Sequence, residues 1–341
     1  MLLLRDVQKN DLPALSRLAA ELDTINLPSN DEELEELVDK SVRSFSGRIR
    51  NPLEREYLFV LEESSSARII GTSMIIAQHG TREAPHVFFD VTEREHYSAS
   101  LDKHMRHRVL SIGYNYDGPT EVGGLVVEPA SRGTPDRPGK QLSYVRFLFI
   151  AMHRRNFRDR VLAELLPPLM PNGRSHLWET VGAKFTGLTY EEADRLSRRN
   201  KEFIKELFPS TDIYATLFPK RAQEVLGEVG AQTRGVQRML ERVGFRYVER
   251  IDPFDGGPHF EARTDDLTLV RRAAFPRVHP EALEVQGEDM LVGVEREAGR
   301  NRFRAVRCQA RLDEKSIMIP RWVTGSLELE PGMKVSCTPF E

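Results

Sequence analysis

The chain has 341 residues, of which 40% are hydrophobic and 30% are charged, a balance typical of a globular protein with a sizeable core. A formal net charge of −3 excludes a whole-protein attraction to nucleic acid or to an anionic membrane, so any anion site must be local. Two cysteines, Cys308 and Cys337, are too few for a disulfide framework. Because Arg5 and Asp6 directly follow the apolar residues 1–4, we expect no signal peptide, no membrane span and a cytoplasmic location.

The first third of the chain alternates between strand and helix patterns. Apolar or alternating runs predict four strands, over residues 2–7, 57–61, 69–76 and 87–91. Asp11 is a good N-cap for a first helix, and Asn30 or Asp31 caps a second one that ends at Gly47. Strands and helices that alternate in this way indicate an α/β fold.

The stretch over residues 121–150 carries the clearest functional pattern. A short apolar strand (Leu125, Val126 and Val127) leads into a loop rich in Gly, Pro and Arg, and a helical pattern follows from Lys140. The free N–H groups of a helix start attract anions, so this connection predicts a phosphate-binding site. Its candidate residues beyond the strand are Arg132, Arg137, Gly139, Lys140 and Gln141. An ordinary strand-to-helix connection with solvated basic residues remains the alternative.

Residues 96–107 are unusually rich in histidine, with His96, His104 and His107 close together. A metal site needs several ligands at suitable spacing on a defined element. His104 and His107 are three residues apart, but no third ligand is evident, so we predict no metal site.

The middle of the chain contains a pattern that occurs twice. A helix that Ser175 caps ends near Gly182, and a similar helix ends at Gly244, each followed by a basic residue and an aromatic one. Helical segments over residues 191–207 and 220–229 lie between them. The repetition predicts a duplicated architecture whose second copy is abbreviated.

The composition changes after Arg272. Short alternating runs follow, over residues 290–294, 303–308, 316–319 and 334–337. Several short strands at this spacing predict a small all-β module, a barrel or a sandwich. The predicted domains are therefore residues 1–190, 191–273 and 274–341.

Four motifs together resemble the arginine N-succinyltransferase family over roughly residues 1 to 273. They are Leu2-Leu3-Leu4-Arg5, the run YLFVLE over residues 57–62, the run over residues 139–149, and Phe254-Asp255-Gly256-Gly257-Pro258. The resemblance implies a GNAT-like acyltransferase fold with two GNAT-like halves. It also implies transfer of a succinyl group from succinyl-CoA to the α-amine of arginine, or of ornithine in some members, in arginine catabolism. Succinyl-CoA or another acyl-CoA would then be a co-substrate, with no permanently bound cofactor, and Leu125 would meet it through its main chain. A homo-oligomer or a hetero-oligomer of related subunits is expected.

The chain departs from the family pattern at two functional positions. Arg137-Pro138-Gly139 stands where the family usually has G-N-G, and Pro138 removes one N–H donor. Gly230 stands where the family has a histidine that is its proposed acid/base. An acyltransferase for another acyl donor or amine, or a ligand-binding homologue without turnover, therefore remains an alternative.

Acyl transfer requires a base for the amine and a donor for the oxyanion. Glu121, at the start of the central strand, and His259, directly after the glycine motif, are the candidate bases; an exposed glutamate and a solvated or hydrogen-bonded histidine are the alternatives. Backbone N–H groups of the central strand are the candidate oxyanion donors. Candidate residues for binding the amino-acid substrate are Asp255, Gly256, Gly257 and Glu261.

Overall fold

The computed structural model describes residues 1–340 except 23–26, 29, 83, 198, 199, 281–284 and 297–301. The chain forms two compact units, each assembled from separated segments. Unit 1 consists of Met1–Gln78, Thr120–Asp159 and Arg263–Glu341, and unit 2 of His79–Pro119 and Arg160–Ala262. The borders of these units therefore differ from the expected domain borders, which lie after residues 190 and 273. No helix within the described residues is long and apolar enough to cross a bilayer.

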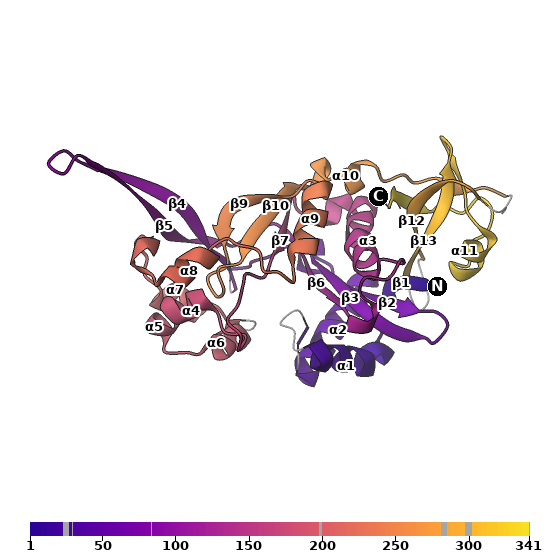
Figure 1. The fold of residues 1–341 in the computed structure, drawn as a ribbon. Coiled ribbons are helices and arrows are strands. Elements are labelled where there is room, and N and C mark those ends of the chain that lie inside the picture. Colours follow the sequence, from indigo (N-terminus) through magenta and orange to yellow (C-terminus); the bar gives the residue numbers. More distant parts are fainter. Residues whose placement is uncertain are drawn as a thin grey trace. The chain divides into compact units, whose positions relative to one another are not determined.

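Unit 1 is a mixed α/β structure built on one sheet, which is antiparallel except where β11 pairs in parallel with β14 (Figure 1). Its strands are β1 (Leu2–Asp6), β2 (Glu56–Glu63), β3 (Arg68–Ile76), β6 (Thr120–Val127), β11 (Arg277–Val278), β12 (Glu288–Glu295), β13 (Phe303–Leu312), β14 (Ser316–Met318) and β15 (Ser336–Pro339). Its helices are α1 (Leu12–Leu22), α2 (Asp31–Phe45), α3 (Pro138–Met152), α10 (Thr268–Arg271) and α11 (Arg321–Ser326). The strand order is β11-β14-β13-β1-β2-β3-β6, and β12 pairs with both β13 and β15.

The C-terminal strands are part of this sheet. β1 pairs with β2 on one side and with β13 on the other, where Leu4 faces Ala305. The expected strands after residue 274 are present, but they complete the sheet of unit 1 and do not form a separate module. The sequence could not reveal this pairing because the partners lie about 300 residues apart.

Alternation along β2 directs side chains to both faces of the sheet. Leu58 and Val60 pack in a core with α1 and α2, whereas Phe59 lies edge-on to Phe149 of α3, with ring centres 5.4 Å apart. Figure 1 shows α1 and α2 on the opposite side of these strands from α3. The predicted N-cap of α2 is also present, since Asn30 Oδ1 accepts the N–H of Glu32 at 2.8 Å.

Asp6 is buried where β1 meets β13. Its carboxylate accepts the N–H of Phe303 at 3.0 Å and the side-chain amide of Gln8 at 2.7 Å. Burial raises the pKa of Asp6 to about 6, although the bond from Phe303 opposes this rise.

We therefore expect unfolding free energy to fall as pH rises through this region. A group whose folded-state pKa is raised stabilises the fold below about pH 4, and this stabilisation is lost as pH rises through about 6. The free energy of unfolding should fall by at most about 3 kcal/mol over this range, and Asp6→Asn should remove most of this pH dependence. Urea denaturation between pH 4 and 8 measures the free energy of unfolding, and Asp313→Asn is the control because Asp313 is exposed. Equal pH dependence of the two variants would contradict the assignment.

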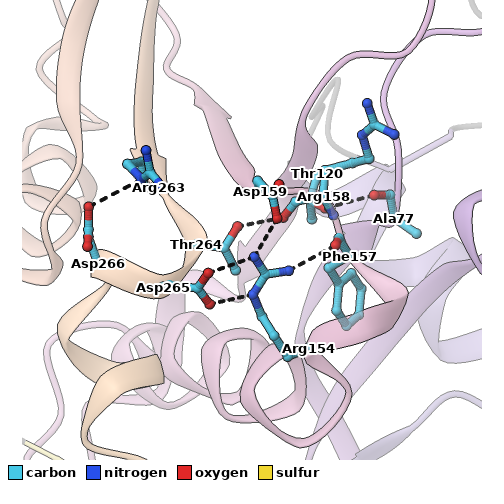
Figure 2. Close-up of polar contacts among 10 residues, drawn as sticks. All are labelled: Ala77, Thr120, Arg154, Phe157, Arg158, Asp159, Arg263, Thr264, Asp265 and Asp266. Atoms are coloured by element: carbon cyan, nitrogen blue, oxygen red, sulfur yellow. Dashed lines mark hydrogen bonds and ion pairs between the residues drawn. The ribbon is translucent and has the colours of Figure 1, made fainter.

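The chain passes between the units four times, at residues 78/79, 119/120, 159/160 and 262/263. Residues next to these passages are hydrogen-bonded to one another within unit 1 (Figure 2). Thr120 Oγ1 donates to Ala77 O at 2.7 Å and accepts the N–H of Arg158 at 2.9 Å. Thr264 Oγ1 donates to Arg158 O at 2.6 Å. All four passages are therefore gathered at one place in unit 1.

Arg154 completes this network. Its guanidinium binds both carboxylate oxygens of Asp265, at 2.5 and 2.9 Å, and Oδ1 of Asp159 at 2.7 Å (Figure 2). The Asp159 carbonyl accepts the N–H of Thr264 at 3.0 Å, so Arg154 reinforces a backbone contact between two of the passages.

Unit 2 has the strand order β7-β10-β9-β4-β5-β8, with helices packed around a core that contains Trp178. Its strands are β4 (His86–Ser98), β5 (Lys103–Asn115), β7 (Arg160–Glu164), β8 (Ile213–Tyr214), β9 (Arg246–Ile251) and β10 (Pro258–Arg263). Its helices are α4 (His176–Thr180), α5 (Gly182–Thr186), α6 (Tyr190–Ser197), α7 (Glu202–Leu207), α8 (Lys220–Val225) and α9 (Arg234–Val243). Of the helical segment expected over residues 191–207, residues 198 and 199 lie outside the described part of the chain.

The predicted cap at Ser175 and the predicted helix end at Gly244 are confirmed, whereas Gly182 begins α5 and the helix expected over residues 220–229 ends at Val225. Ser175 Oγ accepts the N–H of Trp178 at 3.0 Å, which caps α4, and Gly244 ends α9 with a φ of 119°. The histidine-rich stretch over residues 96–107 lies on the long β4–β5 hairpin (Figure 1). His96 and His104 are exposed there.

Candidate active site

A β-bulge interrupts the central strand, β6. Gly123 faces Met74 of β3 and Val126 faces Thr72, so Gly124 and Leu125 together face Ser73 alone. Gly124 has a φ of 58°, which glycine adopts without strain, and its carbonyl accepts the hydroxyl of Thr72 at 3.0 Å. A bulge leaves one backbone group outside the ladder and is common beside active sites. The bulge thus places a candidate oxyanion donor at the position where the resemblance puts Leu125.

The loop between β6 and α3 encloses a pocket of about 510 Å³. Its lining includes five of the predicted phosphate-binding residues, which are Val127, Arg132, Arg137, Gly139 and Lys140. Leu125 and Val126 lie along β6 outside this lining, and Gln141 is buried beneath the loop, where its amide donates to Asp136 O at 2.8 Å.

The first turn of α3 supplies the pocket's positive character. Arg137 is the N-cap residue, with a left-handed φ of 52°, and Pro138 occupies the first helical turn. Arg132 and Arg137 are exposed, and Lys140 Nζ lies 4.7 Å from the centre of the Phe340 ring. Helix N–H groups and guanidinium groups together favour a diphosphate here.

Arg137→Ala should weaken CoA binding without unfolding unit 1, because Arg137 is exposed. A charge-assisted contact to phosphate contributes about 1.5–3 kcal/mol, which predicts a Kd roughly 10-fold to 100-fold higher. Isothermal titration calorimetry with CoA measures the change. Arg155→Ala is a matched control, because Arg155 is exposed just beyond the other end of α3. Equal CoA affinity of the two variants would place the phosphate site elsewhere.

Arg146 of α3 is a buried cation beside the bulge. Its Nη1 donates to Gly123 O at 3.1 Å, and its other hydrogen bonds go to Ser143 O at 3.2 Å and Ser143 Oγ at 2.8 Å. All of these acceptors are uncharged. These bonds, which are the ones found among the described residues, leave further guanidinium N–H groups that can donate to a ligand. Burial lowers the pKa of Arg146 to about 9, which leaves it charged at pH 7. A buried charge usually has a partner of opposite charge, so this side chain is suited to an anionic ligand.

Glu121 lies two residues before Gly123 on the same face of β6. A Cβ atom on Gly123 would lie 3.2 Å from Glu121 Oε1, so this carboxylate extends along the strand towards the bulge. The side chain is half-buried. A carboxylate, a guanidinium and a bulged backbone thus surround Gly123.

The predicted substrate-binding residues lie in unit 2, in and after the turn that links β9 to β10. Gly256 has a φ of 83°, and a Cβ atom on Gly257 would lie 2.3 Å from Leu165 O, so both positions require glycine. Asp255 Oδ1 accepts the N–H of Gly257 at 2.7 Å. Glu261 already binds Arg160, Oε2 to Nε, at 2.7 Å.

Burial, and then the neighbouring Asp252, raise the pKa of Asp255 well above its usual range. The surroundings of Asp255 therefore disfavour its charged form.

His259 lies on β10 beside a second buried histidine, His86 of β4. Their rings stack with centres 5.2 Å apart, and both Nε2 atoms approach Glu164 Oε1, at 3.2 Å from His86 and 3.3 Å from His259. Burial lowers the pKa of each histidine to about 4, so both imidazoles are neutral at pH 7.

The sequence analysis missed three residues of these two sites. Arg146 has a detectable signal, because it falls four residues after Leu142, on the apolar face of the predicted helix. His86 and Glu164 have no such signal in the sequence, because they lie on separate strands far from His259 along the chain.

Comparisons with known proteins show the family of this chain. A family model described as arginine N-succinyltransferase beta subunit matches residues 2–269. The chain belongs to the arginine N-succinyltransferase family. The arginine N-succinyltransferase of Yersinia pestis (strain Pestoides F) is 33% identical over 293 residues, which cover 85% of this chain and 83% of that protein. The one from Escherichia fergusonii is 31% identical over 291 residues, covering 84% and 83%.

The structure of arginine/ornithine succinyltransferase subunit AI from Pseudomonas aeruginosa matches with a TM-score of 0.85 and 29% identity. The match covers 100% of this chain and 99% of that chain. The predicted family and the mixed α/β fold are therefore confirmed. The C-terminal strands, which lie outside the sequence resemblance, belong to the same family fold, since the structural match includes them.

Proposed function

We propose that this protein transfers the succinyl group of succinyl-CoA to the α-amine of arginine. Family membership supports acyl transfer, and the buried Arg146 supports succinyl as the acyl group. A succinyl thioester ends in a carboxylate, which an acetyl group lacks. A guanidinium with uncharged protein partners beside the bulge is suited to bind that carboxylate in a bidentate manner.

The proposed roles follow the course of β6. The pocket at the start of α3 holds the CoA diphosphate, and the pantetheine arm runs along β6 towards Gly123, about 13 Å from Val127. The bulged backbone donates to the thioester oxygen as it becomes an oxyanion. Arg146 holds the distal carboxylate and so fixes the carbonyl carbon beneath this donor.

Glu121 is the proposed general base. The neutral amine nitrogen attacks the thioester carbon, Glu121 accepts the proton that this nitrogen loses, and the C–S bond breaks to release CoA as a thiolate that takes up a proton. His259, the other candidate, is fully buried in unit 2. We place the base at Glu121 because it lies on the strand that carries the bulge.

Gly230 occupies the position of the family's proposed catalytic histidine, and this chain is adapted to a glycine there. A Cβ atom would lie 2.8 Å from Pro167 O and 3.0 Å from Leu166 O, so any side chain requires the backbone to shift. The Gly230 N–H also donates to Leu166 O at 2.8 Å. Turnover with Gly230 therefore depends on another base.

An oligomer is also proposed. The P. aeruginosa relative is described as a subunit, AI, and the family description names a beta subunit. Light scattering coupled to size-exclusion chromatography measures the assembly of this chain, and a monomer at working concentration would contradict the proposal.

Steady-state kinetics with a panel of acyl-CoAs and amines tests the proposed reaction. We expect the highest kcat/KM for succinyl-CoA with arginine, with ornithine as the informative second amine. Turnover with a different donor or amine alone would make the protein an acyltransferase of other specificity. CoA binding without turnover of any pair would make it a ligand-binding homologue.

A further inference from the structure

His79, His86, Glu164 and His259 of unit 2 form what we call the imidazole cluster. His79 precedes β4, His86 is the first residue of β4, Glu164 is the last residue of β7, and His259 is the second residue of β10. Nitrogen and oxygen atoms of His79, His86 and Glu164 all lie within 4.8 Å of one another. His259 Nε2 reaches the same Glu164 oxygen as His86 does.

The topology of the sheet explains why these side chains meet. β9 lies between β4 and β10 and ends at Ile251, which faces Phe89 on one side and Pro258 on the other. His86 lies beyond that point on β4, where β9 no longer separates the two strands. The register of β10 shifts between Pro258 and Phe260, and this irregularity turns His259 towards His86.

The two buried histidines have unusual surroundings. His86 is 1% exposed and His259 is fully buried, yet neither ring nitrogen of either residue has a hydrogen-bond partner among the described residues. The contacts with Glu164 are short enough for hydrogen bonds but do not have the required geometry. Such groups in a native protein call for an explanation, and a bound ion is one of the few available.

The spacing of the donor atoms fits an ion. Two ligands each about 2.0–2.1 Å from a tetrahedral zinc lie about 3.3–3.4 Å apart. The distance from Glu164 Oε1 to His86 Nε2 is 3.2 Å. We propose that the imidazole cluster binds one divalent first-row transition metal ion through His79, His86 and Glu164, with His259 stacked on His86 beside it.

Imidazole and carboxylate donors without thiolate favour Zn²⁺, Co²⁺, Ni²⁺ or Fe²⁺ over Cu⁺. Half-buried His79 and Glu164 give the ion a route from solvent. The ligands come from β4, β7 and the segment before β4, so the ion joins segments whose ligands lie up to 85 residues apart, from 79 to 164. Its role is structural, and it is independent of the proposed acyl transfer.

Metal binding by the full-length protein tests the proposal. After treatment with a chelator and its removal, we expect calorimetry to show one tight site for Zn²⁺. A hundredfold excess over Kd should raise Tm by roughly 4 °C. Co²⁺ should give the intense visible bands of a tetrahedral or five-coordinate site. His86→Asn and Glu164→Gln should abolish the tight site and the Tm gain.

The exposed histidines of the β4–β5 hairpin provide matched controls in the same unit. His96→Asn and His104→Asn should keep the tight site and the Tm gain. If the controls lose the site and the cluster variants keep it, the proposal is wrong. A wild-type protein with neither a tight Zn²⁺ site nor Co²⁺ bands overturns it even where a cluster variant fails to fold.

Discussion

Arg146→Met should lower kcat/KM for succinyl-CoA by about 30-fold to several thousand-fold and change kcat/KM for acetyl-CoA by only a few-fold. The physical reason is the loss of a buried, charge-assisted contact to the distal carboxylate, which is typically worth about 2–5 kcal/mol. Acetyl-CoA has no such carboxylate, so its transition state does not depend on this contact. The ratio of the two constants, measured in one preparation, is the readout.

This ratio separates a binding role for Arg146 from a structural one. Arg146 also donates hydrogen bonds to Gly123 O and Ser143 Oγ, and its removal breaks both. A purely structural role would slow both donors by the same factor. Arg146→Lys retains a charge but not the planar fork, and it should recover part of the preference. The affinity for free CoA, which lacks the succinyl group, should stay unchanged in both variants.

Glu121→Gln should reduce kcat by about 10²-fold to 10⁴-fold, the usual contribution of a general base. Glutamine keeps the size of the side chain, so CoA affinity and unfolding behaviour should match those of the wild type. The pH–rate profile carries the sharper test. With Glu121 as base, the wild-type rate levels off as pH rises, whereas the Glu121→Gln rate climbs steadily as the substrate amine itself loses its proton.

His259→Ala completes this comparison. If the rate of His259→Ala still levels off as pH rises, while the rate of Glu121→Gln climbs steadily, the base is Glu121. The opposite pattern assigns it to His259. If both variants match the wild type in rate and profile, neither residue is the base, and attack by an amine already deprotonated in solvent becomes the better account.

Local sequence patterns predicted the strand, the loop and the helix that surround the pocket at the start of α3. The loop between β6 and α3 was found because strand, glycine turn and helix start are contiguous, and five of its expected residues line one pocket. The bulge at Gly124 escaped detection, since it depends on how β6 aligns with Thr72 and Met74 of another strand.

Long-range pairing limited the remaining predictions. The expected domain border after residue 273 is not a border between the two units, because β13 pairs with β1 of unit 1. The imidazole cluster escaped for a similar reason. The sequence shows histidines close together at 96–107, where the structure leaves His96 and His104 exposed on a hairpin, whereas His86 and His259 meet only through the strand order β10-β9-β4.

The pairing of β1 with β13 also bears on how the chain is made. Leu4 is synthesised about 300 residues before its partner Ala305. At roughly 5–20 residues per second, this edge of β1 waits about 15–60 s for its partner. Throughout that interval an apolar strand edge is open to pairing with other chains. Newly synthesised molecules should therefore depend on chaperones far more than the completed protein does.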